Sequence, residues 1–294
     1  MSSDAAAHST LHPPCALQQH PYFAATLRAM GRDASTAPLV LDGTQVGQLQ
    51  SVRRAFGPLS LRWVPRGPLW TIPLTATQKR AALRHSAPRA PLWLVNCETA
   101  ADTILWGRNL RVAPGQHLAS LDLGQSHDIR LARQHGKWRN RLRHAQSGPL
   151  ISRIRRFDPL MDAPLLDLER TRRKTRHYAG YPPIFTRTWA QVHPHATLMA
   201  SARNKGETLA FVLCLLHGPA ATYHIGWSGA RGRMLLAHNL LMWEMSNWLA
   251  ARGFTRFDLG LAHPAHTPGL THFKTGFGAC LHRLGPTILT RLPA

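Results

Sequence analysis

Short apolar runs, separated by turn residues such as Asp42-Gly43 and Gly57-Pro58, fill the first 125 residues. Runs of this length between turn residues predict β-strands. Thr75 and Gln78 form a capping-box pattern, which predicts the start of a helix. We therefore expect strands to alternate with helices in this half. The predicted segments are helix 22–30, strands 38–41, 46–52 and 59–64, helix 75–85, strand 92–96, helix 99–107 and strand 117–123.

The second half begins with a helical pattern over 128–146. Leu131, Trp138, Leu142 and Ala145 recur at spacings of seven, four and three residues, which places them on one face of a single long helix. Beyond it the apolar pattern predicts the order β-α-α-β-β-β-α-β-α-β. The segments are strand 150–155, helix 162–176 capped by Asp162, helix 186–193, strands 196–202, 209–216 and 221–227, helix 234–251, strand 254–259, a short helix ending near 276, and strand 281–292.

Two domains are expected, because 294 residues exceed the usual size of a single domain. We expect a loose tail over 1–16, a first domain over 17–125 and a second over 126–294. Both halves mix strands with flanking helices, and the first looks like a truncated copy of the second. The predicted fold class is therefore α/β (α+β), with two mixed sheets.

Basic residues far outnumber acidic ones. The chain has 36 Lys and Arg against 14 Asp and Glu, for a formal charge of +22. Such a field favours anionic partners such as phosphates, nucleic acid or an anionic membrane surface. Between Ile129 and Phe157 there is no acidic residue, while Lys137 and Arg141 lie in the predicted long helix. A solvated helix face is the ordinary alternative; the lack of compensating acids favours phosphate contacts.

The sequence gives no support for a disulfide-rich, metal-binding, secreted or membrane-spanning protein. The four cysteines form no CxxC pair and the 18 histidines form no HExxH pattern, so we expect neither a disulfide framework nor a metal. The first residues carry no apolar signal-peptide core. The longest apolar run, 209–216, is too short to span a bilayer. We expect a cytoplasmic protein without a transmembrane segment, and leave contact with a membrane surface open.

The stretch 252–279 carries the strongest candidate chemistry. Lys274, one of few lysines, lies between Phe273 and Phe277, which share a face of a helical turn. Gly276 and Gly278 follow, where glycine allows positive φ or the close approach of a ligand. An ammonium beside bare backbone amides can stabilise an anion or an oxyanion. A capped helix with a surface lysine is the alternative.

The order of elements in the second half resembles the GNAT acyltransferase fold, and three stretches resemble the FemAB-type transferases within that superfamily. KWRNRLRHAQSGPLISRI (137–154) is similar to the basic helix, glycine and strand that join their two halves. ATYHIGWSGARGRMLLAHNLLMWEMSNWLAARGFTRFDLG (221–260) is similar to their strand, loop, long helix and strand ending in Asp. GLTHFKTGFGA (269–279) is similar to their FKxGFG signature. The resemblance covers about 115–285.

The resemblance implies tandem GNAT-like lobes that transfer an acyl or aminoacyl group to an amine. Lys274 matches the FK lysine, whose implied role is to stabilise the oxyanion or a substrate phosphate. Asp258 matches the strand-ending Asp and is expected to orient an amine, accept a proton or cap the next loop. The strand before the long helix is expected to separate from its neighbour, with Gly226 at a bulge and Tyr223 as proton donor. A core tyrosine is the alternative for Tyr223.

The donor stays open between acyl-CoA and aminoacyl-tRNA. Users of acetyl-CoA carry a glycine-rich loop, roughly RxxGxG, at the start of the long helix. This chain has SGARGR there, with Arg231 and Arg233 but a different spacing. A helix N-terminus at this place still favours an anion. The departure and the positive charge favour tRNA. The alternative to an enzyme is a non-catalytic GNAT-fold protein that binds RNA or another anionic polymer.

Overall fold

The computed structural model describes residues 14–57 and 59–291. Its chain forms two compact units: one is Leu118–His282, and the other is Cys15–His117 together with residues 283–291. The predicted tail, 1–16, lies almost wholly outside the described residues. The domain boundaries expected from the sequence, 17–125 and 126–294, stay a prediction. The two mixed sheets flanked by helices confirm the expected fold class.

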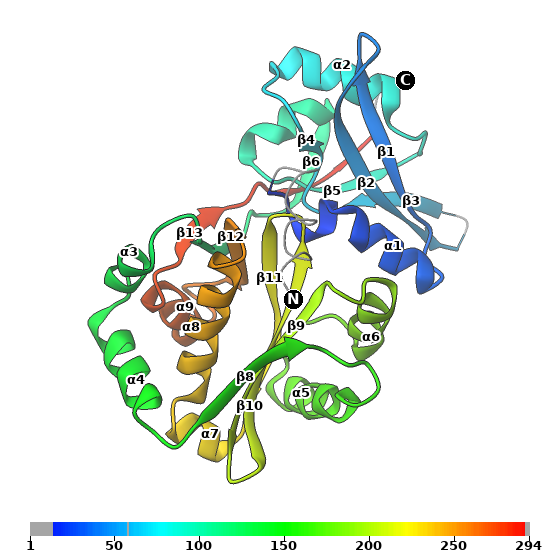
Figure 1. Cartoon of the computed structure of the whole chain (residues 1–294). Helices are drawn as coiled ribbons and strands as arrows, with labels where there is room; N and C mark the ends of the chain where they lie inside the picture. Colours follow the sequence, from blue (N-terminus) through cyan, green and yellow to red (C-terminus); the bar gives the residue numbers. More distant parts are fainter. Residues whose placement is uncertain (1–13, 58, 292–294) are drawn as a thin grey trace. The chain divides into compact units, whose positions relative to one another are not determined.

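The N-terminal unit is built on one sheet in the order β1-β2-β3-β5-β14-β6, with β4 paired to β2 (Figure 1). Its strands are β1 (Ala34–Leu41), β2 (Thr44–Phe56), β3 (Leu59–Val64), β4 (Leu69–Trp70), β5 (Trp93–Asn96), β6 (Asn109–Ala113) and β14 (Thr287–Thr290). Its helices are η2 (Leu17–Gln19), α1 (Pro21–Ala29), α2 (Ala76–Ser86) and η3 (Ala100–Trp106). β4 and β6 were not expected from the sequence.

A helix cap and a buried aromatic core stabilise the N-terminal unit. The Thr75 side chain accepts from the backbone N–H of Gln78, and the Gln78 side chain accepts from the N–H of Thr75, so the predicted capping box at the start of α2 is confirmed. The core lies between the sheet and the elements α2 and η3. Trp93 and Trp106 are fully buried there, with ring centroids 5.8 Å apart.

The C-terminal unit holds a second sheet, in the order β13-β7-β12-β11-β10-β9-β8. Its strands are β7 (His117–Asp122), β8 (Ile151–Arg156), β9 (Thr197–Asn204), β10 (Glu207–His217), β11 (Ala220–Ser228), β12 (Arg256–Ala262) and β13 (Cys280–Arg283). Its helices are α3 (His127–Ala132), α4 (Gly136–Gln146), α5 (Ala163–Arg176), α6 (Pro183–Val192), α7 (Ala230–Met234), α8 (Ala237–Ala250) and α9 (Pro268–Gly276). In Figure 1, α4, α8 and α9 lie on one side of the sheet and α5 and α6 on the other.

The helix expected over 128–146 is two helices, α3 and α4. The chain leaves the helical path between them, and the backbone N–H of His135 donates to the carbonyl of Gly276. Gly278, at φ +99°, brings its Cα against Arg133. The break therefore accommodates the end of α9, a contact between segments far apart in sequence. Trp138, Leu142 and Ala145 face inward as predicted.

Three other expectations were wrong in detail. The helix expected over 234–251 is α8 but begins only at Ala237, because Leu236 adopts a left-handed conformation that separates it from the short helix α7. The strand expected over 281–292 is two strands, β13 and β14, which belong to different sheets; Pro286, which lacks an N–H, interrupts it. Asp162 makes no side-chain cap to α5 and instead forms a bidentate ion pair with Arg155.

Candidate active site

Two neighbouring strands separate near the middle of the C-terminal sheet. β11 and β12 run parallel and pair only at Ala220–Arg256, Ala221–Phe257 and Thr222–Asp258. Both strands continue beyond this point, β11 to Ser228 and β12 to Ala262, without further pairing to each other. The expected separation of strands is therefore present. We call the space between residues 223–228 and 259–262 the wedge; backbone amides that lack a ladder partner along such an edge can donate to a carbonyl oxygen.

The β-bulge beside the wedge lies at His224. Tyr223 pairs with Cys214 and Ile225 with Leu213, so His224 is the extra residue. The bulge expected at Gly226 is wrong, because Gly226 pairs regularly with Val212. Gly226 has a different reason to lack a side chain. A Cβ there would lie 2.2 Å from the Tyr223 hydroxyl oxygen and 2.7 Å from Cε1 of His238.

Tyr223 is connected to α9 through His238. Its hydroxyl lies 3.3 Å from Nε2 of His238, on α8. The His238 ring in turn lies 5.7 Å from the Phe273 ring on α9. Burial raises the pKa of Tyr223 well above its ordinary value, so its hydroxyl keeps its proton at neutral pH. The structure therefore brings the β11 arm of the wedge into contact with the motif that holds Lys274.

Lys274 is buried against the other arm. Its side chain is 6% exposed, and its Nζ donates to the carbonyl of Leu261 at 2.7 Å. A Cβ on Gly260 would lie 3.8 Å from the same Nζ. Burial lowers the pKa of Lys274 to about 8, and no carboxylate in the described residues forms an ion pair with it. An ammonium has three donors, and only one of them has an acceptor within residues 14–57 and 59–291, so two remain for a substrate oxygen.

The aromatic residues and glycines around Lys274 pack against α4. Phe277 stacks on Trp138 with ring centroids 4.7 Å apart, and Phe273 lies 6.0 Å from the same ring. A Cβ on Gly276 would lie 3.2 Å from the Trp138 ring. Gly276 and Gly278 therefore permit close packing of α9 on the α3–α4 junction, and their expected role in binding a substrate stays a prediction without structural support.

Asp258 is held by a neighbour on its own strand. Its side chain is 2% exposed. Its two carboxylate oxygens accept from Nε and an Nη of Arg256 at 2.7 and 2.6 Å. A carboxylate in a bidentate guanidinium pair has little capacity left to take a proton from an amine. The expected role as a base stays a prediction, and the chemistry proposed below does not use Asp258.

Arginines gather where β11 ends and α7 begins. Arg172, on α5, and Arg233 both donate to the carbonyl of Ser228, at 3.3 and 2.7 Å. Arg231 is exposed and forms an ion pair with Glu207 at 2.9 Å. The structure thus brings Arg233 near the end of the wedge, together with Arg172, which the sequence did not single out. Each guanidinium keeps donors that can meet a phosphate.

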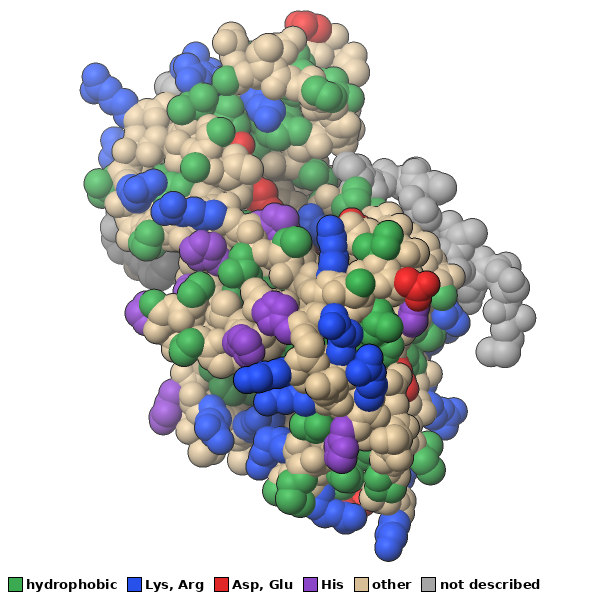
Figure 2. Space-filling view, turned by 90° about the vertical axis from the view of Figure 1, so that its left-hand side faces the viewer, with side chains coloured by type: hydrophobic (Ala, Val, Ile, Leu, Met, Phe, Trp, Pro, Cys, Tyr) green, Lys and Arg blue, Asp and Glu red, His purple; other side chains and the backbone are tan. Residues whose placement is uncertain are grey.

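Lys137 and Arg141 lie elsewhere, on the outer side of α4. Both are exposed, whereas Trp138 and Leu142 of the same helix are buried. Figure 2 shows the face on which α3 and α4 lie, where Lys and Arg side chains gather over the C-terminal unit with histidines among them. This surface fits a long anion better than the reacting group of a small substrate. The expected donor contacts of Lys137 and Arg141 stay a prediction.

Sequence reasoning missed several polar groups near the wedge. His238 lies on a mainly apolar helix, and no spacing marks it. His224 hydrogen-bonds Thr186 at 2.7 Å, and Tyr178 donates to the buried Glu169 at 3.1 Å. Burial, with Arg173 nearby, lowers the pKa of His224 to about 3. The first contact joins α6 to β11 and the second ties the loop after α5 to that helix, so only the folded chain reveals them.

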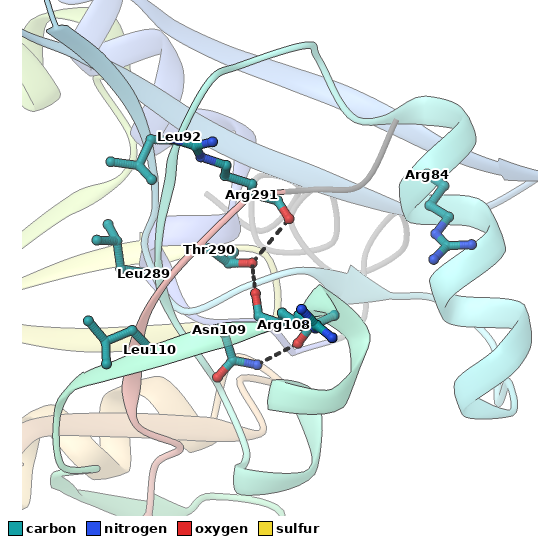
Figure 3. A pocket seen from close by; sticks show the side chains of 9 residues that line it. Arg84, Leu92, Arg108, Asn109, Leu110, Leu289, Thr290 and Arg291 are labelled. Atoms are coloured by element: carbon teal, nitrogen blue, oxygen red, sulfur yellow. Dashed lines mark hydrogen bonds between the residues drawn. The ribbon is translucent and has the colours of Figure 1, made fainter.

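A separate pocket lies in the N-terminal unit (Figure 3). It is an open depression of about 710 Å³ lined by Leu92, which precedes β5, by Leu110 on β6 and by Leu289 on β14. Arg84, Arg108 and Arg291 stand around it and are exposed. No residue of the wedge lines this pocket. No group of three or more His, Cys, Asp or Glu within residues 14–57 and 59–291 could hold a metal ion, and no helix there is long and apolar enough to cross a membrane.

Comparison with known proteins agrees with this geometry. Residues 132–275 match a family described as "Acetyltransferase (GNAT) domain". No curated protein matches the chain significantly in sequence. Among solved structures, FemX shares 14% identity with a TM-score of 0.75, covering 98% of this chain and 96% of that chain.

Two further structures share the fold. The C-terminal domain of a putative lysylphosphatidylglycerol synthetase from Agrobacterium fabrum has 16% identity and a TM-score of 0.52, covering 95% of this chain and 89% of that chain. A tandem GNAT protein from the clavulanic acid biosynthesis pathway has 13% identity and a TM-score of 0.52, covering 99% and 92%. At these identities the likeness establishes the tandem GNAT-like fold.

Proposed function

We propose that the chain belongs to the GNAT superfamily and is an N-acyltransferase of the FemAB type, because residues 132–275 match a GNAT domain and the fold is shared with FemX. It would transfer an acyl group from an activated donor to an amine. The observation that carries the proposal is the pair of functional groups on the two arms of the wedge: the Lys274 ammonium beside β12 and the Tyr223 hydroxyl on β11.

The proposed chemistry follows from these two groups. When an amine attacks the acyl carbon, negative charge develops on the carbonyl oxygen. The Lys274 ammonium, held in a site with little water, stabilises that charge more strongly than it would in bulk water. The Tyr223 hydroxyl supplies a proton to the leaving group. Because the pKa of Lys274 is lowered only to about 8, the side chain is mostly charged at neutral pH.

For the donor we propose an acyl-CoA. The matched family is described as an acetyltransferase domain, and Arg172 and Arg233 converge on the end of β11 next to the wedge. Guanidinium groups suit the bidentate recognition of phosphates. Aminoacyl-tRNA is the other donor expected from the sequence, and the cationic outer face of α4 is the feature that favours it. The acceptor is proposed only as a primary amine.

Mass spectrometry tests this function. The purified chain would be incubated with acetyl-CoA, a long-chain acyl-CoA or charged tRNA, each with a panel of primary amines including peptides and amino sugars. We expect one acceptor to gain the mass of the acyl group from a CoA donor. Transfer from charged tRNA alone would overturn the choice of donor. Absence of transfer from every donor, together with RNA binding that weakens steeply with salt, would favour the non-catalytic alternative.

A further inference from the structure

The side chains of His238 and Tyr223 are in contact next to the wedge. Nε2 of His238 lies 3.3 Å from the Tyr223 hydroxyl oxygen, and the two rings are nearly perpendicular, at 74°. Gly226 leaves room for both, since a Cβ there would collide with the hydroxyl and with the imidazole. Phe273, on α9, also contacts the imidazole, with ring centroids 5.7 Å apart. Three elements thus hold one histidine against one tyrosine.

The imidazole is neutral under ordinary conditions. Burial, together with the nearby charge of Arg172, lowers the pKa of His238 to about 4. A neutral imidazole carries one N–H and one lone pair. His238 can therefore either donate to the tyrosine oxygen through Nε2 or accept from its hydroxyl, and the two arrangements have different consequences for the reaction.

We propose that His238 is a positioning residue for acyl transfer: its Nε2–H donates to the Tyr223 oxygen and directs the Tyr223 O–H into the wedge. The inference rests on the proposed function and adds a residue to it. Burial opposes the loss of the Tyr223 proton, because a phenolate is poorly stabilised away from water. An N–H aimed at the phenol oxygen offsets that penalty, since a hydrogen bond to the charged form favours it.

In the proposed reaction Tyr223 gives one proton and takes one back. The amine nitrogen forms the new C–N bond, and the C–S bond of the acyl-CoA breaks with its electron pair on sulfur. Tyr223 gives its proton to the sulfur, and its oxygen then takes a proton from the newly acylated nitrogen. Tyr223 ends as it began, and His238 keeps its single proton throughout. The products are an amide and a free thiol.

The tautomer of His238 provides a test that needs no substrate. The full chain would be labelled with ¹⁵N-histidine, and His238 assigned by comparison with His238→Gln. Long-range ¹H–¹⁵N spectra at neutral pH are expected to show Nε2 protonated and Nδ1 unprotonated. A spectrum with Nδ1 protonated and Nε2 bare would overturn the inference, because the tyrosine hydroxyl would then point at the imidazole and away from the wedge.

A double-mutant cycle tests the same pair in turnover with acetyl-CoA and the amine found by mass spectrometry. His238→Phe is expected to lower kcat at least about 10-fold, as for one lost hydrogen bond to a developing charge, with KM for acetyl-CoA unchanged. His238→Gln, whose amide can donate, should recover most of the loss. In a Tyr223→Phe background, His238→Phe should cause no further loss.

These experiments distinguish a failure of the His238 inference from a failure of the proposed acyltransferase function. An equal loss from His238→Phe with and without the Tyr223 hydroxyl would show a merely structural role and overturn the inference. Full activity in Tyr223→Phe, beside an inactive Lys274 variant, would overturn it while leaving the acyltransferase intact. If no donor is used at all, the proposed function fails, whereas the tautomer measurement still decides the geometry of the pair.

Discussion

Replacing Lys274 by Met is expected to lower acyl transfer by about 10²–10³-fold, the loss typical of one preorganised oxyanion donor. The same change should make the protein more stable. Lys274 is 6% exposed and makes no ion pair within the described residues, so its charge is held in the protein at a cost in folding free energy. Methionine has similar length and no charge, and it fills the same space.

The sign of the stability effect follows from the pKa of Lys274. Its folded value, about 8, lies below the ordinary 10.5. Between these values the unfolded chain binds more protons, so stability rises with pH. The penalty is fully present below about pH 8 and disappears as pH rises toward 10.5. Lys274→Met should therefore gain about 1–3 kcal/mol in free energy of unfolding at pH 7 and little near pH 11.

Urea denaturation at the two pH values, beside single-turnover rates, measures both effects. Lys174→Met is the matched control, because Lys174 is exposed on α5 and its removal should change neither quantity beyond about 0.5 kcal/mol. Transfer at the wild-type rate in Lys274→Met would remove Lys274 from the reaction. Equal stability at pH 7 would show that the ammonium has a partner or water that relieves its burial.

Gly226→Ala is the second substitution with a large expected effect. The new Cβ would lie 2.2 Å from the Tyr223 hydroxyl oxygen, which is the far end of a side chain and can move away. We expect kcat to fall about 10²-fold, because misplacing a group by about 1 Å removes its contribution to catalysis. Stability should change by less than about 1.5 kcal/mol. Steady-state rates and thermal unfolding measure the two quantities.

Gly232→Ala gives the contrasting control on α7. There the Cβ would lie 2.3 Å from the backbone oxygen of Leu209, which cannot move without the strand. We expect a loss of about 1–3 kcal/mol in stability, with the Tyr223 geometry unaffected. If Gly226→Ala instead lowered the stability by more than about 1.5 kcal/mol while the folded protein kept the wild-type kcat, the tyrosine hydroxyl would not be the group that the glycine accommodates.

Much of the fold follows from local sequence signals. The capping box at Thr75 and the short apolar strands act within a few residues, and the structure confirms both. The turn at Lys205-Gly206 between β9 and β10 is equally local. The turn places both residues at positive φ, as a two-residue hairpin requires. The FK motif was also visible in the sequence, and helical spacing places Phe273 and Phe277 on one face, where both meet Trp138.

The remaining features depend on contacts between distant segments. The break between α3 and α4 exists because His135 bonds the carbonyl of Gly276, which no local pattern encodes. β14 lies between β5 and β6, far from them in sequence. A role for His238 can be recognised only from its contacts with Tyr223 and Phe273 in the folded chain. The sequence left the role of Asp258 open between orienting an amine, accepting a proton and capping a loop, and it did not indicate the contact of both carboxylate oxygens with Arg256.

The central claim is that the reacting carbonyl lies in the wedge between β11 and β12. A crystal structure with a non-hydrolysable thioether analogue of acetyl-CoA measures this directly. We expect the carbonyl oxygen of the analogue within about 3 Å of Lys274 Nζ, with the Tyr223 hydroxyl facing the sulfur. An analogue bound with its carbonyl outside the wedge, while Lys274 still donates only to Leu261, would contradict the account.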